Sequence, residues 1–412
     1  MRLVIHNPHT LWYKKTVGSV ISGTRSVDKY EPFFNYLYYN NSKVYVFLDN
    51  SSFTKFSFRY TIPVLFNFYL WLIINRLSLL KFKIILDSNK LKKDDVLFTF
   101  LYENFTNETG VFKVNRKIIN SRFEKMSCLK VIHLSHYGYN SKLGATNCRL
   151  IGVDYFVAES NLFINSPFFR ENFNWYQKDV LVLPFVPGER FIVKKMFKDR
   201  KNIAVATGTL TSAISDPVFF DFFKSNILQP MRSTIFENSE FLKNQVDCKI
   251  SKVKHLVRNK SAYFEHVILK IRSYARLFYF LLNSKDFKYY SNDRDYFKSD
   301  IVETYNDYKM FVNPEEIIGL PGIGFVEGMA CGAVYIGKVD KMYSDLGMIE
   351  GIHYIGYDGS LEDLKSKIEY YQNNQSELET IAANSIEFVQ TRLNSYSVYT
   401  KFIKEISFYL AN

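Results

Sequence analysis

Short apolar runs alternate with helical patterns along most of this chain, and this alternation restricts the fold more than any other feature. Two strands joined through a helix normally lie parallel, because the helix returns the chain to the same end of the sheet. The pattern therefore predicts an α/β protein with parallel sheets that carry helices on their faces. The expected strands are Arg2–His6, Val44–Asp49, Lys83–Asp87, Val96–Phe100, Lys130–Leu134, Tyr155–Ala158, Val180–Pro184, Asn202–Leu210, Tyr308–Val312, Ala333–Gly337 and Gly351–Tyr357.

The length of the chain predicts more than one domain. It has 412 residues and a mass of 48.5 kDa, whereas single cores seldom grow beyond about 250–300 residues. Residues 180–191 contain Pro184, Pro187 and Gly188, which suit a linker between domains. We therefore expect one domain over 1–188, a second over 189–390, and a C-terminal helix over 391–412 that can cross back to the first.

Cysteine usage and the N-terminus bear on the compartment. The cysteines are widely spaced and form no Cys-x-x-Cys pair, which predicts a reducing compartment and no structural zinc. Residues 1–6 are typical of a strand, and no apolar stretch of a signal peptide follows them. A cytoplasmic location is therefore expected.

A glycine-rich stretch, 319–332, precedes the apolar run 333–337. It predicts a turn that opens a short helix with Glu327 in its first turn. Glycines let a ligand approach the backbone, and the N–H groups at a helix start favour an anion such as a diphosphate. A carboxylate one turn later can bind sugar hydroxyls. A plain tight turn with a solvated glutamate fits the same residues.

The region after this stretch predicts a strand and a capped helix. Ser360 stands three residues before Asp363, which is the spacing of a helix cap. Leu364, Ile368 and Tyr371 then recur at helical spacing.

Together these residues resemble the C-terminal domain of GT-B nucleotide-sugar glycosyltransferases. Pro314 matches the proline that follows the family's strand, Glu327 matches its second acid, and residues 330–332, Ala-Cys-Gly, match its helix exit. The resemblance covers about a hundred residues. It implies a GT-B fold, in which two Rossmann-like domains face across a cleft, and it implies that Glu327 binds the ribose of the nucleotide.

The first acid of the family is not matched. Gly319 stands eight residues before Glu327, and the nearest carboxylates, Glu315 and Glu316, lie further upstream. The resemblance therefore leaves a retaining or an inverting outcome open.

Phosphate contacts are expected at the end of the first strand of the second domain. Residues 207–209, Thr-Gly-Thr, stand where the family has a glycine loop, and Arg232 is the best substitute for the family's missing basic residues. A packing salt bridge is the alternative role of Arg232. The expected donor-binding residues are Thr207, Gly208, Thr209, Arg232, Glu315, Gly322, Ile323, Gly324, Phe325 and Glu327.

Catalytic groups are expected where strands of the first domain end. His133 and His136 close one strand, and His136 is placed further beyond its carboxyl end, where open parallel sheets bind ligands. His136 can act as a base near neutral pH or bind the sugar, or it can simply pack. Glu159, followed by Ser160, ends the next strand and competes for the role.

Two further segments bear on membranes. Residues 64–74 are almost wholly apolar but too short to span a bilayer, so a buried helix is favoured over interfacial contact. Residues 251–290 carry nine Lys/Arg against Glu265 and Asp286, with apolar residues at helical spacing. An anionic membrane surface and a core-facing stripe explain this helix equally well; nucleic acid is not favoured, since no binding-fold signature accompanies the charge.

We therefore expect a glycosyltransferase that moves a sugar from a nucleotide-sugar donor to a glycan or lipid-linked acceptor in cell-envelope polysaccharide synthesis. The protein would be cytoplasmic or peripheral at the inner membrane face. No metal or other cofactor is expected, because no Asp-x-Asp motif closes an apolar strand; residues 292–295, Asn-Asp-Arg-Asp, stand in a polar context. The alternatives are a nucleotide-sugar epimerase of the same fold and a non-catalytic protein that binds membrane or nucleic acid.

Overall fold

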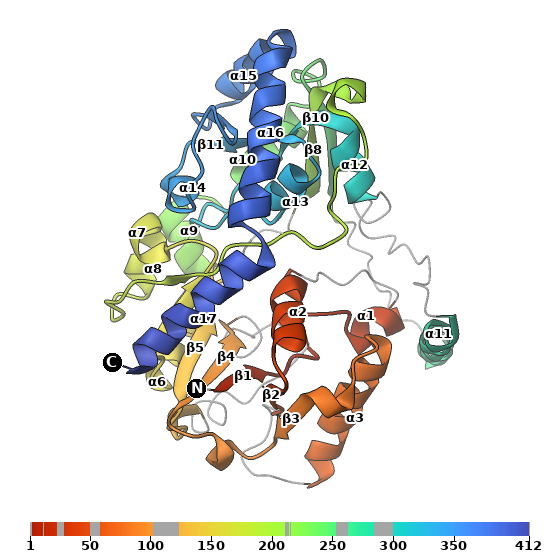
Figure 1. Cartoon of the computed structure of the whole chain (residues 1–412), viewed down its shortest axis with the longest axis vertical. Helices are drawn as coiled ribbons and strands as arrows, with labels where there is room; N and C mark the ends of the chain where they lie inside the picture. The colour runs from red at the N-terminus through yellow and green to blue at the C-terminus, as the bar shows by residue number, and fades with distance from the viewer. Residues whose placement is uncertain are drawn as a thin grey trace. The chain divides into compact units, whose positions relative to one another are not determined.

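The computed structural model of the chain (Figure 1) describes residues 2–10, 12–22, 29–49, 58–101, 123–210, 214, 216–252, 263–283 and 300–411. Two parallel sheets of seven and five strands organise these residues, which confirms the predicted α/β class with two Rossmann-like sheets.

The first sheet has the strand order β3-β2-β1-β4-β5-β6-β7. Its strands pair in parallel, for example Val4 opposite Tyr45 and Val4 opposite Leu97. Apolar residues fill the central strands, as expected for a sheet covered on both faces. The strands are β1 (Arg2–His6), β2 (Val44–Phe47), β3 (Phe82–Ile85), β4 (Asp95–Phe100), β5 (Leu129–His133), β6 (Tyr155–Ala158) and β7 (Leu181–Val182).

The second sheet has the order β12-β11-β10-β8-β9. Its strands are β8 (Lys201–Leu210), β9 (Val246–Lys252), β10 (Tyr308–Val312), β11 (Val334–Lys338) and β12 (Ile355–Tyr357). The edge strand β9 was not predicted, because its polar sequence shows no apolar run. The predicted strand 351–357 is shorter than expected, since residues 351–353 form a turn.

Helices connect the strands. They are α1 (Val17–Ser22), α2 (Glu31–Asn40), α3 (Phe58–Ile74), α6 (Ser141–Leu150), α7 (Leu162–Asn165), α8 (Pro167–Asn172), α9 (Pro217–Phe223), α10 (Pro230–Glu237), α11 (Tyr263–Asn283), α12 (Ile301–Asp307), α13 (Gly324–Ala330), α14 (Lys341–Asp345), α15 (Leu361–Asn373), α16 (Gln375–Arg392) and α17 (Ser395–Ala411). Single 3-10 turns occur at Leu79–Lys81, Ser88–Lys90 and Phe197–Asp199.

Helix α15 shows how the sequence pattern builds the core. The Ser360 hydroxyl accepts a hydrogen bond from the Asp363 N–H at 3.1 Å, which confirms the predicted cap. Leu364, Ile368 and Tyr371 face one core cluster with strands β8, β10, β11 and β12. The predicted helical face therefore covers the second sheet.

Helix α3, which contains the apolar residues 64–74, begins earlier, at Phe58, and Pro63 lies inside it. Phe68, Trp71 and Leu72 are buried, whereas Phe66 and Ile73 are 64% and 62% exposed. The segment is thus buried on one face only. In the described part of the chain, no helix combines the length and apolarity needed to cross a membrane.

The chain forms two compact units. One comprises residues 1–133, 146–154 and 254–297, and the other comprises 134–145, 155–253 and 298–412. All strands of the first sheet lie before the expected boundary at 188/189, and all strands of the second sheet lie after it. The compact units divide the chain differently, because residues 134–145 and 155–188 belong to the second unit. Within the second unit, Tyr409 of α17 lies 4.7 Å from Tyr155 of β6, measured between ring centroids.

Candidate functional site

Every residue that the sequence nominates for donor binding or catalysis belongs to the second compact unit. The strand register explains part of this grouping. Ala206 of β8 pairs with Val312 of β10, so Thr207 of β8 stands beside Asn313, which directly follows β10. Polar groups at the carboxyl ends of neighbouring parallel strands are where α/β proteins bind ligands.

Gly208 brings Arg232 against the end of β8. Gly208 has a φ of +128°, and a Cβ at this position would lie 2.7 Å from Cζ of Arg232. Arg232, in α10, is 8% exposed and donates to the Thr209 carbonyl at 3.3 Å and to Gln229. The glycine is therefore required by the close approach of a guanidinium group.

Asn313 joins Arg232 to the glycine turn and was missed in the sequence. Its Oδ1 accepts from Arg232 Nη2 at 3.3 Å. The side chain is 6% exposed, and its Nδ2 has no hydrogen-bond partner among the residues that the structure describes. The only sequence signal was its position between a buried strand and Pro314. A buried amide with N–H groups to donate is a suitable ligand for an anionic oxygen.

The glycine turn packs directly on Asn313. A Cβ on Gly322 would lie 2.4 Å from Asn313 Nδ2, and one on Gly324 would lie 2.8 Å from both Asn313 Cγ and the Tyr305 hydroxyl. Helix α13 begins at Gly324, with Ile323 as its N-cap residue and no side-chain cap. These glycines thus make room for neighbouring side chains, so a valine there would disturb packing as well as any ligand.

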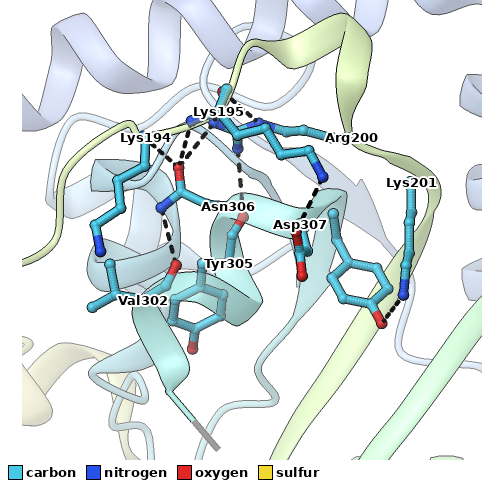
Figure 2. Close-up of polar contacts among 9 residues, drawn as sticks. Lys194, Lys195, Arg200, Lys201, Val302, Tyr305, Asn306 and Asp307 are labelled. Carbon is cyan, nitrogen blue, oxygen red and sulfur yellow. Dashed lines mark hydrogen bonds and ion pairs between the residues drawn. The ribbon is translucent and has the colours of Figure 1, made fainter.

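A hydrogen-bond network holds the helix that supports this turn. Figure 2 shows Arg200, which donates to the Tyr305 carbonyl at 3.4 Å and to the Lys195 carbonyl at 2.8 Å. Asn306 accepts from the Lys194 N–H at 2.6 Å and donates to the Val302 carbonyl at 3.0 Å. Arg200 also donates to the Cys331 carbonyl at 2.8 Å, at the end of α13. The network fixes α12, whose Tyr305 closes the space beside Gly324.

Glu315 occupies a buried hydrogen-bond network of its own. Its Oε1 accepts from the hydroxyls of Tyr335 at 3.1 Å and Tyr343 at 2.9 Å, and from the Lys338 N–H at 2.9 Å. Burial raises the pKa of Glu315 above its ordinary value, and the backbone and tyrosine hydrogen bonds oppose that rise. This geometry gives Glu315 a structural task between β10 and β11, and its role in donor binding stays a prediction.

Glu316 points to a different partner, His136. The carboxylate Oε1 lies 3.8 Å from His136 Nδ1, and the two side chains are 10% and 22% exposed. His136 has a φ of +52°, which is uncommon for a residue other than glycine. A histidine beside a carboxylate can be oriented as a base. The sequence identified His136 but did not separate Glu316 from Glu315.

The loop after β10 is anchored at two points close to His136. The Tyr137 hydroxyl donates to the Ile318 carbonyl at 2.6 Å and shares a hydrogen bond with Ser166 at 2.8 Å. The Ser160 hydroxyl donates to the Gly319 carbonyl at 2.6 Å. In addition, the Ile317 N–H donates to the Leu228 carbonyl at 2.8 Å, just before α10. One loop therefore links His136 and Glu316, called here the His136 group, to Arg232 and Asn313, called here the Arg232 group.

The remaining nominated residues are placed as follows. Thr207 is buried within β8, and Glu159 is 3% exposed directly after β6. Glu327 is half-buried in the first turn of α13. Phe325 is fully buried against Tyr335, so its side chain belongs to the core. Residues 254, 258, 260, 285, 288 and 292–295 lie outside the described residues.

No family model and no curated protein matches this chain. Solved structures similar to the chain include HepE from Anabaena in complex with UDP and glucose, with 12% identity, coverage of 99% of each chain and a TM-score of 0.48. A glycosyltransferase from Rickettsia africae has 12% identity, covers 100% of this chain and 99% of its own, and has a TM-score of 0.49.

A third similar structure is the pneumococcal O-GlcNAc transferase GtfA in complex with UDP and GlcNAc. The two sequences are 11% identical, the match covers 79% of this chain and 58% of the GtfA chain, and the TM-score is 0.40. At these identities and TM-scores, the assignment of the fold rests on the strand order of the two sheets.

Proposed function

We propose that this protein is a glycosyltransferase that moves a sugar from a nucleotide-sugar donor to a glycan or lipid-linked acceptor. The observation that carries the proposal is the buried pair of Arg232, which lies against Gly208 of β8, and Asn313, which directly follows β10. The residues that resemble the GT-B signature, Pro314 and Glu327, belong to the loop and helix that follow the same strand.

The Arg232 group suits the diphosphate of the donor. Three neutral acceptors, the Thr209 carbonyl and the amide oxygens of Gln229 and Asn313, orient its guanidinium. A charged N–H donor and a nearby amide N–H are the groups that stabilise a departing phosphate oxygen. Following the resemblance, Glu327 binds the ribose hydroxyls. The donor therefore lies over the carboxyl edge of the second sheet.

The His136 group suits the reacting end of the sugar. In the transfer, an acceptor hydroxyl oxygen forms a bond to the anomeric carbon, and the bond from that carbon to the diphosphate oxygen breaks. The proton of the acceptor hydroxyl passes to a base, and the electron pair of the broken bond leaves with the diphosphate. His136, oriented by Glu316, is the proposed base, with Glu159 as the competing group.

The acceptor is proposed from charge. The chain has a net charge of +12, which favours an anionic acceptor such as a glycan on a phosphate-containing lipid carrier. Such an acceptor fits cell-envelope polysaccharide synthesis.

The test is a transfer assay. The protein is mixed with nucleotide sugars that carry an isotope-labelled sugar, and with glycan or lipid-linked acceptors. We expect labelled sugar on the acceptor, together with one nucleoside diphosphate released for each sugar transferred. Conversion of the donor to an isomeric nucleotide sugar in the absence of acceptor would establish the epimerase instead. No nucleotide binding at all would overturn both enzyme assignments.

A further inference from the structure

Two helices of the first compact unit present rows of large apolar side chains to solvent. On α3, Ile62, Phe66, Tyr69 and Ile73 are 51%, 64%, 40% and 62% exposed. On α11, Ile271, Tyr274, Phe278 and Leu282 are 63%, 66%, 65% and 67% exposed. Residues spaced three or four apart lie on one face of a helix, so each row is a continuous stripe.

The opposite faces of these helices hold them in the fold. Val20 of α1, Ile74 of α3 and Phe280 of α11 form one buried cluster, and Leu70 and Leu277 pack against it. Among the described side chains of α11, burial is therefore confined to a narrow face that includes Leu277 and Phe280. Over residues 271–282 the apolar stripe of α11 faces outward, whereas a core-facing stripe was the other arrangement that the sequence allowed. Exposed apolar stripes of this size mark contact surfaces.

Positive charge borders the stripe on α11. Arg272 is exposed on its flank, and Arg276 donates to the Ile21 carbonyl at 3.3 Å. The sequence around the helix, residues 251–290, has nine Lys/Arg against two acidic residues. An apolar face flanked by cations is the composition of helices that lie in the interface of an anionic membrane.

We propose that the exposed faces of α3 and α11 dock this protein on a lipid bilayer surface that contains anionic lipid. The apolar side chains insert between the headgroups, and Arg272 contacts lipid phosphates. A second copy of the chain fits less well, because a two-fold interface places the same patch against itself and would oppose like charges. The proposal does not depend on sugar transfer.

The first experiment measures binding to vesicles of phosphatidylcholine, with and without phosphatidylglycerol, by flotation. We expect binding to the anionic vesicles that weakens as salt rises, because surface attraction is screened over about 10 Å at 0.1 M salt. The double variants Ile271→Gln/Phe278→Gln and Phe66→Gln/Ile73→Gln should each lower the partition coefficient about tenfold or more. Both alter exposed side chains, so a circular dichroism melt should confirm an intact fold.

A matched control uses equally exposed apolar residues elsewhere. Met196 and Phe408 are 64% and 63% exposed in the second unit, and Met196→Gln/Phe408→Gln should leave vesicle binding unchanged. Arg272→Gln should reduce binding mainly at low salt. Phe278→Trp should show a blue-shifted emission that lipids brominated in their chains quench, whereas Phe408→Trp should not.

Three results would overturn the proposal. The parent protein fails to float with anionic vesicles, or the stripe variants float as well as the parent. Alternatively, the stripe variants change only a monomer–dimer equilibrium measured by analytical ultracentrifugation, which would identify the face as a contact between copies.

Discussion

Glu315 and Glu316 are neighbours in the sequence, yet their carboxylates lie in different surroundings. Glu315 accepts hydrogen bonds from two tyrosine hydroxyls and a backbone N–H, whereas Glu316 faces His136 at 3.8 Å. Adjacent residues in an extended loop point to opposite sides, which separates a structural acid from a proposed functional one. No pattern in the sequence could make this distinction, because it depends on what each side meets.

This difference predicts opposite phenotypes for two identical substitutions. Glu316→Gln should leave the fold intact and lower turnover about 100-fold, the scale of general-base catalysis, because His136 loses its charged neighbour. Glu315→Gln should cost about 1–3 kcal/mol of unfolding free energy, because the Tyr335 and Tyr343 hydroxyls and the Lys338 N–H lose a charged acceptor. Steady-state kinetics and urea denaturation of both variants test the pair. Equal turnover in parent and Glu316→Gln would remove Glu316 from the site.

His133 gives a second prediction at the residue scale. It is fully buried, its ring nitrogen lies 3.0 Å from the Tyr30 hydroxyl, and burial lowers its pKa to about 3. In the unfolded chain a histidine has a pKa of about 6.5. Below pH 6.5 the unfolded state binds the proton first, so the contribution of His133 to stability is lost as pH falls from 6.5 towards 3.

The expected slope is about 1.4 kcal/mol per pH unit. His133→Gln removes the titrating group while keeping an amide near Tyr30. Between pH 6.5 and 4.5, the parent should therefore lose about 2–3 kcal/mol more unfolding free energy than the variant. Urea denaturation at the two pH values measures both losses, and equal losses would show that His133 is not buried neutral.

At the scale of elements, helix α17 packs against the rest of the fold through one buried face. Val398, Tyr399, Phe402 and Ile406 are 7%, 2%, 1% and 2% exposed, whereas Phe408 on the same helix is 63% exposed. The helix was expected from the sequence, but its buried face was not, because the surface that covers it comes from residues distant in the chain.

Two phenylalanines on α17 provide a matched comparison. Phe402→Ala should destabilise the protein by about 3–5 kcal/mol, since it leaves a cavity in the core. Phe408→Ala should change stability by less than about 0.5 kcal/mol. Chemical denaturation of both variants measures the difference. Similar losses for the two substitutions would contradict the described orientation of α17.

At the scale of the whole molecule, the sequence predicts the two parallel sheets and most strand positions. Strands such as β1 and β6 are apolar runs between polar ends, so local composition is sufficient to find them. The edge strand β9 and the Arg232–Asn313 contact depend on pairing between residues far apart; Arg232 and Asn313 are separated by 81 positions in the sequence. A single sequence holds no record of such contacts.

The same limit explains the exposed stripes. The apolar run 64–74 and the helical periodicity within 251–290 predict two helices, but not which partner covers the apolar face of each. In the structure, a small cluster around Phe280 covers the opposite face. The sequence left a membrane surface and a core as alternatives, and the packing of α1, α3 and α11 favours the membrane surface.

The central claim is that the Arg232 group binds the diphosphate of a nucleotide, and calorimetry with nucleoside diphosphates and monophosphates tests it most directly. The parent should bind a diphosphate more tightly than the matching monophosphate. Arg232→Gln should lose about 1.5–3 kcal/mol of diphosphate binding, roughly 10- to 100-fold in affinity. Arg170→Gln, at an exposed arginine of the same compact unit, should bind as the parent does. If Arg232→Gln binds the diphosphate as tightly as Arg170→Gln, the guanidinium serves packing alone and the proposed donor site is wrong.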